Sequence, residues 1–199
     1  MRIRTEKKRR EIIEVAAALF EERGFEGSSM DAIVQRMGGS KSTLYGYFPS
    51  KEALLRAVLN VDLTEWVDQT MDLCLRGQHL CDGLARLGTA YLSRRLSPLS
   101  IAHLRIGSVQ STHSPIGSDF HHMVLKPAWR KLADRFERLM EEGKLDRADP
   151  WVAAMHWKGL NEGDMLERRL LGDLVAPDAA EIRLAATCAA QAFLKIYGR

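Results

Sequence analysis

Residues 24–55 have the sequence GFEGSSMDAIVQRMGGSKSTLYGYFPSKEALL, which contains two short helical patterns on either side of a glycine turn. Ser28 or Ser29 provides a side-chain oxygen that caps the first helix, and Gly38 with Gly39 ends it. Two helices of roughly eight residues joined by such a turn have the proportions of a helix-turn-helix. This segment therefore predicts a unit that presents one short helix to the major groove of DNA.

The second of these helices, expected over residues 41–48, has two chemically different faces. Leu44 and Phe48 lie four residues apart, so both side chains point to the core of the domain. On a helical wheel Ser42 and Gly46 lie nearly opposite these two apolar residues, and the face that they form is small and polar. Such a face suits close approach to base edges.

Helical periodicity also dominates the rest of the chain, and no stretch shows the sustained alternation of a strand. We therefore predict an all-α fold, with a helix-turn-helix DNA-binding domain at residues 1–50 and a larger helical domain at 51–199. Asp149 and Pro150 make a good helix start, because they combine a cap acceptor with a proline in the first turn. The helices expected outside the motif span residues 5–23, 51–75, 79–96, 99–111, 118–142 with an interruption near Pro127, 150–171 and 177–197.

The composition excludes several classes of protein. A hydrophobic fraction of 46% in 199 residues is enough to form a core, and no apolar run approaches the ~20 residues that span a bilayer. Three cysteines are too few for a disulfide scaffold, so we expect a cytoplasmic protein with no membrane partner. The net charge of +3 is modest, but the first ten residues include six basic ones. This basic run is either a solvated helix start or a contact to DNA, and the neighbouring motif favours the contact.

Residues 24–55 resemble the DNA-binding signature of the TetR family of transcriptional regulators. The match includes the Gly-Phe pair after the first helix, the serine cap, the glycine turn, Thr-Leu-Tyr at 43–45 and Ser-Lys-Glu at 50–52. These residue types at these spacings are specific, whereas a single apolar period could recur by chance. Two positions depart from the pattern, because Gly39 replaces an apolar residue and Gly46 replaces a larger side chain.

The resemblance implies that the start of the second short helix contacts bases. Lys41, Ser42 and Thr43 are the candidates, because lysine donates to guanine acceptors and hydroxyls donate or accept. A unit this small contacts few base pairs, so specificity normally requires two copies about a twofold axis. We therefore expect a homodimer on palindromic, double-stranded operator DNA, and hence a protein associated with the nucleoid.

Contacts to the DNA backbone are implied at five further positions. Tyr45 and Tyr47 match aromatic positions that pack and often bind phosphate in the family. Ser28 and Lys51 lie at helix N-termini, where backbone amides and the helix dipole favour an anion, so both are expected to bind phosphate. Ser29, which competes with Ser28 for the cap position, completes the expected DNA-binding set.

The last two helices are the expected dimer interface. A patch of small residues in the final helix lets a partner helix approach closely. The alternative is that this alanine face packs inside its own subunit, but the resemblance favours a four-helix interface to which residues 150–171 also contribute. The residues expected in this interface are Ile182, Ala185, Ala186, Ala189, Ala190 and Phe193.

The C-terminal region is expected to bind a small, largely hydrophobic effector. Residues 146–172, DRADPWVAAMHWKGLNEGDMLERRLLG, resemble the penultimate helix of the AefR-like branch of the family. In the family this region holds a ligand cavity, and a ligand that prefers the DNA-incompetent conformation weakens DNA binding, typically by about 1–3 kcal/mol. Apolar side chains with a few polar groups are the candidates for the pocket, namely Trp66, Met71, His103, Arg105, Phe120, Met123, Trp129, His156, Trp157, Asn161 and Met165.

No cofactor, metal site or catalytic constellation is expected. The adjacent histidines His121 and His122 point about 100° apart on a helix, and no further ligand spacing completes a site. The sequence GGSKST lacks the glycine spacing of a phosphate-binding loop, and residues 107–111 lack the closing glycine of a nucleophile elbow. We therefore predict a ligand-responsive transcriptional repressor and not an enzyme. The alternative is a DNA-binding or assembly protein with a packed C-terminal core and no effector pocket.

Overall fold

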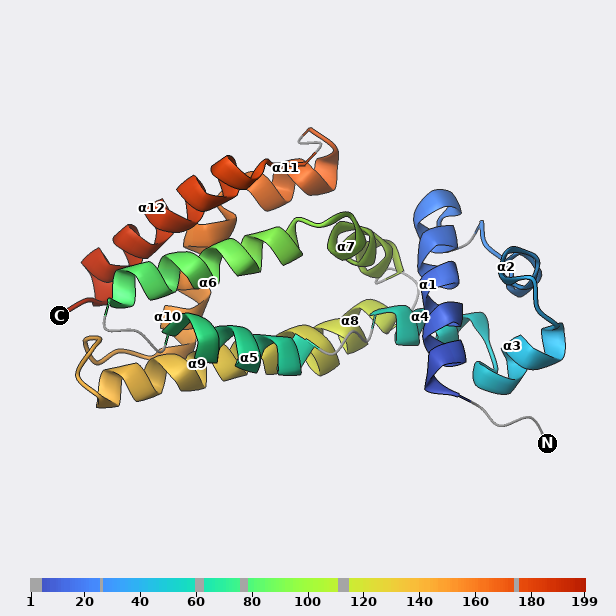
Figure 1. Cartoon of the computed structure of the whole chain (residues 1–199), viewed down its shortest axis with the longest axis horizontal. Coiled ribbons are helices and arrows are strands. Elements are labelled where there is room, and N and C mark those ends of the chain that lie inside the picture. The colour runs from blue at the N-terminus through green and yellow to red at the C-terminus, as the bar shows by residue number, and fades with distance from the viewer. Residues whose placement is uncertain (1–4, 26, 60–62, 76–78, 111–114, 174–175) are drawn as a thin grey trace. The chain divides into compact units, whose positions relative to one another are not determined.

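The computed structural model describes residues 5–25, 27–59, 63–75, 79–110, 115–173 and 176–199 (Figure 1). Over these ranges the regular structure is helical, apart from one isolated antiparallel bridge between Leu145 and Gly198. This confirms the predicted all-α fold. The helices are α1 (Glu6–Arg23), α2 (Met30–Met37), α3 (Lys41–Tyr47), α4 (Lys51–Leu59), α5 (Leu63–Leu75), α6 (Leu80–Arg95), α7 (Pro98–Gln110), α8 (Ile116–Phe120), the π-helical turn η1 (His121–Leu125), α9 (Lys126–Glu141), α10 (Pro150–Glu162), α11 (Met165–Leu171) and α12 (Ala179–Tyr197).

Two of the long helices expected from periodicity are each divided in the structure. Residues 51–75 form α4 and α5, which lie on either side of residues 60–62, outside the described ranges. Residues 150–171 form α10 and α11, because the chain turns at Gly163, whose φ of 48° lies in the left-handed region that glycine tolerates. The start of α10 is confirmed, since the Asp149 side chain accepts the backbone N–H of Val152 at 2.9 Å.

The chain divides by internal packing into two compact units, Met1–Val61 with Ala102–His121, and Asp62–Ile101 with His122–Arg199. The boundary expected at residue 50 therefore lies inside the first unit. The cause is that α4 packs on α1 and on α8, and that Arg56 of α4 forms an ion pair with Asp119 of α8. Each unit has its own hydrophobic core.

The core of the first unit gathers one apolar face from each of its helices. Phe20 of α1 and Phe25 form an edge-to-face contact with ring centroids 5.4 Å apart. Leu44 of α3 and Leu54 of α4 are fully buried in the same cluster. This core positions α3, because α3 has only seven residues and a helix this short requires tertiary packing.

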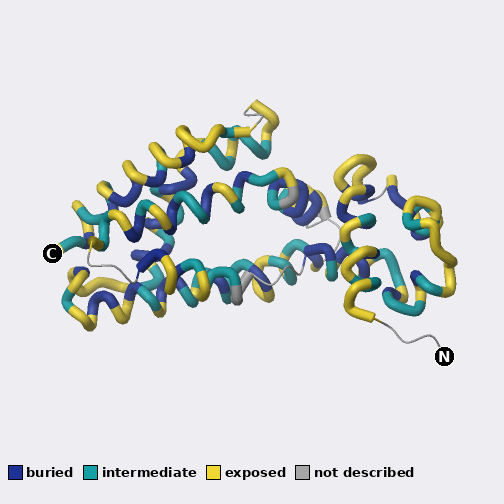
Figure 2. The backbone as a smooth tube through the Cα atoms, in the orientation of Figure 1, coloured by how far each residue is buried: buried dark blue, intermediate teal, exposed yellow. Residues whose placement is uncertain are grey.

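The core of the second unit is centred on the packing of α6 against α12, with α10, α9 and α5 around it. Close approach here depends on Gly88 of α6, since a Cβ at this position would lie 2.3 Å from Asn161 Oδ1 and 3.0 Å from Ala186 Cβ. Trp157 of α10 and Phe193 of α12 are almost fully buried in this core. Figure 2 shows buried and exposed residues alternating along α12, as expected for a helix that covers a core with one face.

Two negative findings hold for the described residues. None of their helices combines the length and apolar character needed to cross a membrane. No group of three or more His, Cys, Asp and Glu side chains among them is arranged to hold a metal ion.

Candidate functional site

The N-terminus of α3 is fixed by Ser40, its cap residue. Ser40 Oγ accepts the backbone N–H of Thr43 at 3.1 Å, and it lies 3.0 Å from Ser42 Oγ and 2.9 Å from Thr43 Oγ1. Behind this turn, Leu44 and Phe48 are buried in the core of the first unit. The hydroxyl groups of Ser42 and Thr43, which are expected to contact bases, therefore lie on a helix whose opposite face is packed in the core.

The outer face of α3 is polar and accessible. Lys41 and Ser42 are exposed, and the Tyr45 side chain is 47% exposed in spite of its size. Lys41 Nζ lies 2.8 Å from the carboxylate of Asp31 on α2, and this hydrogen bond raises the pKa of the Lys41 ammonium group. Because both partners are exposed, this ion pair is weak enough to exchange for contacts with DNA.

Ser28 does not occupy the position expected of a phosphate ligand. Its side chain is buried, and Oγ donates to the backbone carbonyls of Gly24 at 2.7 Å and Leu19 at 3.3 Å. The cap of α2 is instead Ser29, whose Oγ accepts the backbone N–H of Ala32 at 3.1 Å. The sequence prediction for Ser28 is wrong because two adjacent serines match the cap pattern equally well, and only packing decides between them.

Lys51, at the start of α4, is directed into the protein. Its Nζ donates to the backbone carbonyls of Phe25 at 2.9 Å and Ser28 at 3.1 Å, and lies 4.2 Å from the centroid of the Phe25 ring. An ammonium group has three donors, so two are used to hold the connection between α1 and α2. A contact to phosphate could use only the third.

The C-terminal end of α3 is tied to the start of α1. Tyr47 Oη accepts the backbone N–H of Thr5 at 2.9 Å, and keeps its own hydrogen to donate. Thr5 caps α1, whose first turns carry the described part of the basic N-terminal run. Lys7 and Arg10 there are exposed, whereas residues 1–4 lie outside the described ranges.

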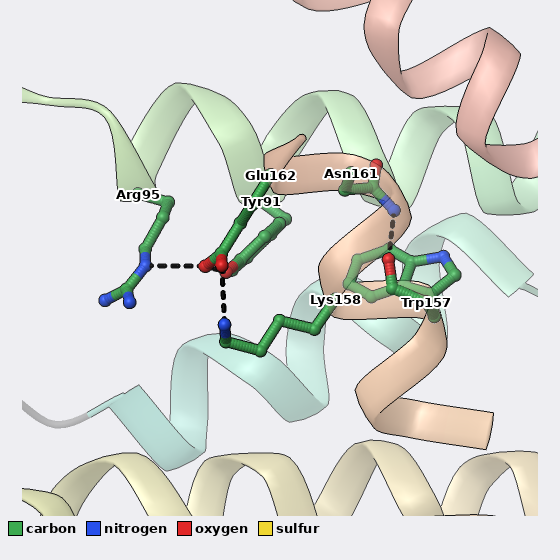
Figure 3. A network of polar contacts seen from close by, with 6 residues as sticks. All are labelled: Tyr91, Arg95, Trp157, Lys158, Asn161 and Glu162. Atoms are coloured by element: carbon green, nitrogen blue, oxygen red, sulfur yellow. Dashed lines mark hydrogen bonds and ion pairs between the residues drawn. The ribbon is translucent and has the colours of Figure 1, made fainter. Parts of the chain in front are cut away.

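The second unit contains a polar network that the sequence analysis did not identify (Figure 3). The carboxylate of Glu162 on α10 accepts the hydroxyl of Tyr91, Nε of Arg95 at 3.0 Å and Nζ of Lys158. Burial acts to raise the pKa of Glu162, but the charge of Arg95 and the hydrogen bonds from Lys158 and Tyr91 outweigh it, so the pKa lies below its ordinary value. Burial raises the pKa of Tyr91, which stays neutral.

The sequence does contain one signal for this network. Tyr91 and Arg95 lie four residues apart on α6, and Lys158 and Glu162 lie four residues apart on α10. Each pair is therefore predicted to share a helix face. The sequence does not show that these two faces meet, because that depends on the tertiary fold. The two pairs were therefore not sufficient to predict the network.

Comparison with known proteins identifies the family. Residues 12–58 match the model for bacterial regulatory proteins of the TetR family. Residues 82–199, more than half of the chain, match the C-terminal domain of AefR-like transcriptional repressors. The chain belongs to the TetR family of transcriptional regulators. It is therefore a regulator and not an enzyme, and its larger domain is of the AefR-like type.

Individual members of the TetR family are similar to this chain in sequence and in structure. The HTH-type transcriptional regulator RutR of Escherichia coli K12 is 42% identical over 60 residues, which cover 30% of this chain and only 28% of RutR. A solved TetR-family structure from Mesorhizobium loti superposes with a TM-score of 0.90 over 100% of both chains at 24% identity, which shows the fold. The flavonoid-responsive regulator FrrA has a TM-score of 0.76 and 29% identity over 98% of both chains.

TetR-family members bind operator DNA and small effectors, commonly as dimers, but the residues expected to bind an effector here are divided between the two units. Asn161 and Trp157 are buried in the second unit, where Trp66, Trp129 and Met165 are half-buried, and Met71 belongs to the core. Two candidates lie on the surface of that unit, since Met123 is exposed and His156 is exposed and bonded to Tyr197 Oη at 2.6 Å. His103, Arg105 and Phe120 belong to the first unit.

The dimer interface expected for this TetR-family chain also requires correction. Five of its six residues are buried within a single chain, four of them in the core of the second unit, and Ala185 is half-buried. A stripe of small residues has the same spacing whether it faces its own subunit or a partner, and here it faces α6. The buried residues are Ile182, Ala186, Ala189, Ala190 and Phe193.

Proposed function

We propose that this TetR-family chain is a ligand-responsive repressor that binds a palindromic operator as a homodimer and is released by a small, largely hydrophobic effector. The observation that carries the proposal is the two-sided construction of α3. Its inner face is buried, whereas Lys41, Ser42 and Tyr45 point outward around an ordered cap. A helix of this kind can enter a major groove without losing its support.

The homodimer is supported by apolar side chains on the outer face of the C-terminal helices. Leu184 and Ile196 of α12 are 67% and 56% exposed in the single chain, and Val152 of α10 is 43% exposed. Leu184 and Ile196 lie twelve residues apart, so they mark two places along α12 where an apolar side chain would be covered by a partner subunit. We propose this outer face, in place of the buried alanine face, as the contact between two subunits.

The effector is supported by the aromatic content of the second unit and by one relative. The centroid of the Tyr91 ring lies 5.4 Å from the ring centroids of both Trp129 and Trp157. Pockets lined by aromatic side chains with a few polar groups are typical of sites for small molecules. FrrA, whose fold is the same, is responsive to flavonoids, which are aromatic. We therefore propose an effector with an aromatic body.

A two-step experiment tests the proposal. Fluorescence anisotropy with labelled genomic duplexes finds a bound operator, and thermal melts against a panel of aromatic compounds find candidate effectors. A compound at about 100 times its Kd adds about 2.7 kcal/mol to the stability of the folded state. We expect such a compound to release the operator. If the operator binds but no compound in a broad panel stabilises the protein or releases DNA, the alternative of a packed core without an effector pocket is favoured.

A further inference from the structure

The network around Glu162 combines three charged groups at a partly accessible place in the second unit. The side chains of Glu162, Arg95 and Lys158 are 9%, 12% and 27% exposed. The carboxylate is thus nearly buried, whereas the lysine is reached from solvent. Figure 3 shows Arg95 and Lys158 approaching Glu162 from different helices, α6 and α10.

The charges within this hydrogen-bonded group do not balance. Arg95 and Lys158 each carry a positive charge, Glu162 carries one negative charge, and Tyr91 is neutral because burial raises its pKa. One positive charge is therefore left over in the group, on two side chains that are 12% and 27% exposed and can be reached by an anion. Two donor groups also remain for a ligand, because Arg95 uses Nε and Lys158 uses one of three hydrogens to reach Glu162.

Aromatic rings border the same group. Tyr91 contributes its hydroxyl to Glu162 and its ring to an edge contact with Trp129. Lys158 Nζ lies 5.9 Å from the Trp129 ring centroid, which places the ammonium group between the carboxylate and the indole. Trp129 is half-buried, so part of its surface remains accessible.

We propose that this group is the anchor of the effector site and that it selects an aromatic carboxylate. The carboxylate of the ligand accepts hydrogen bonds from Lys158 Nζ and from Arg95, which balances the surplus positive charge. Its ring system packs against Trp129 and Tyr91. This inference rests on the proposed function, since it specifies the chemical class of the effector, but ligand binding is measured here without DNA.

The chemical selectivity follows from the charges. A neutral amide of the same shape would leave the positive charge unbalanced, and a cation would be repelled by both donors. An aliphatic carboxylate would satisfy the donors but would lose contact with the flat faces of the rings. The site therefore prefers a ligand that is both anionic and aromatic.

A matched pair of probes tests this selectivity. We would titrate the full chain with 2-naphthoate and with 2-naphthamide, which share their rings and differ in charge, by isothermal calorimetry. We expect the wild-type protein to bind the naphthoate at least about tenfold more tightly, a difference of about 1.4 kcal/mol. Lys158→Met should reduce this ratio to less than about threefold, and Lys158→Arg should restore most of it.

The control variant is Lys131→Met. Lys131 on α9 forms an ion pair with Asp68 of α5 in the same unit, so its removal changes the net charge equally without touching the Glu162 group. The ratio should stay at the wild-type value.

Three results would overturn the inference: no saturable binding of naphthoate up to about 1 mM, a wild-type ratio below about threefold, or a ratio that Lys158→Met leaves unchanged. The wild-type ratio needs no variant, so the test holds even where a variant does not fold. Failure of the proposed function would look different. In that case naphthoate would bind with the predicted selectivity, but neither it nor any other compound would release operator DNA.

Discussion

Lys51 provides the sharpest test of how the DNA-binding unit is held together. The sequence alone predicts that Lys51 binds phosphate, whereas in the structure its Nζ donates to the carbonyls of Phe25 and Ser28 and covers the Phe25 ring. Lys51→Met keeps the length and the apolar stem of the side chain and removes the ammonium group. We expect this variant to have a lower free energy of unfolding and to keep the same number of phosphate contacts.

The size of the effect follows from the contacts. A hydrogen bond to a charged group contributes about 1.5–3 kcal/mol, and a cation–π contact about 0.5–1 kcal/mol at an exposed site. Methionine recovers part of this through contact with the ring, and the two half-buried carbonyls regain some water. The net loss should be about 2–4 kcal/mol, which lowers the melting temperature by about 5–15 °C in a chain of this size.

The measurements are thermal unfolding followed by circular dichroism, and operator affinity as a function of salt well below the melting temperature. Loss of one phosphate contact reduces the salt slope by about one unit, whereas a structural lysine leaves the slope unchanged. Lys7→Met is the comparison variant, because Lys7 is an exposed lysine of the basic N-terminal run that is expected to contact DNA, so its loss should reduce the salt slope and leave the melting temperature unchanged. A Lys51→Met protein that melts like the wild type but has a reduced salt slope would refute the structural role and restore the phosphate contact.

Four further outcomes are expected. Lys41→Ala should change which base is preferred at one position of each half-site, with little change in melting temperature, as measured by competition between single-base operator variants; an unchanged preference would contradict its role in base contact. Tyr45→Ala should weaken binding by a similar factor for all operator variants in the same competition, because the exposed ring is expected to contact the DNA backbone, and a selective effect would contradict this. Leu184→Glu should shift the dimer to monomer in sedimentation velocity, since it places a charge on the proposed subunit contact, whereas an unchanged mass would show that this face is free. Glu162→Gln should make the free energy of unfolding less dependent on pH in acid. The pKa of Glu162 is lowered in the folded state, so its carboxylate stabilises the wild type above the unfolded pKa of about 4.5, and this contribution is lost as the pH falls through the folded pKa. Equal pH dependence in the two proteins would contradict the role of the carboxylate.

The DNA-binding unit could be predicted well because its signals are local. Ser40 begins α3, Leu44 and Phe48 share one face of it, and Gly38 ends α2 with a φ of 63°. Caps, glycine stops and i,i+4 pairs depend on residues close in sequence, so the sequence pattern determines them. The choice between Ser28 and Ser29 depended on burial, and there the pattern was not sufficient.

The second unit could be predicted only in part, because its features depend on which helix faces which. Residues 150–171 have one helical period, but the chain turns at Gly163 and the second half becomes α11. The alanine face of α12 has the composition of a subunit contact, yet it packs on α6, where Gly88 leaves room for Ala186. The Glu162 network joins residues of two helices that lie 67 and 71 residues apart in the sequence, so the i,i+4 pairs on each helix were not sufficient to reveal it.

We propose that two copies of α3 contact bases of one duplex in successive major grooves. The most direct measurement is selection of bound duplexes from a random DNA pool, followed by sequencing of those retained by the wild type and by Lys41→Ala. We expect the wild type to enrich an inverted repeat with two half-sites about one helical turn apart, and Lys41→Ala to enrich a repeat altered at the same position in each half. A pool that stays random, or a single site without twofold symmetry, would contradict it.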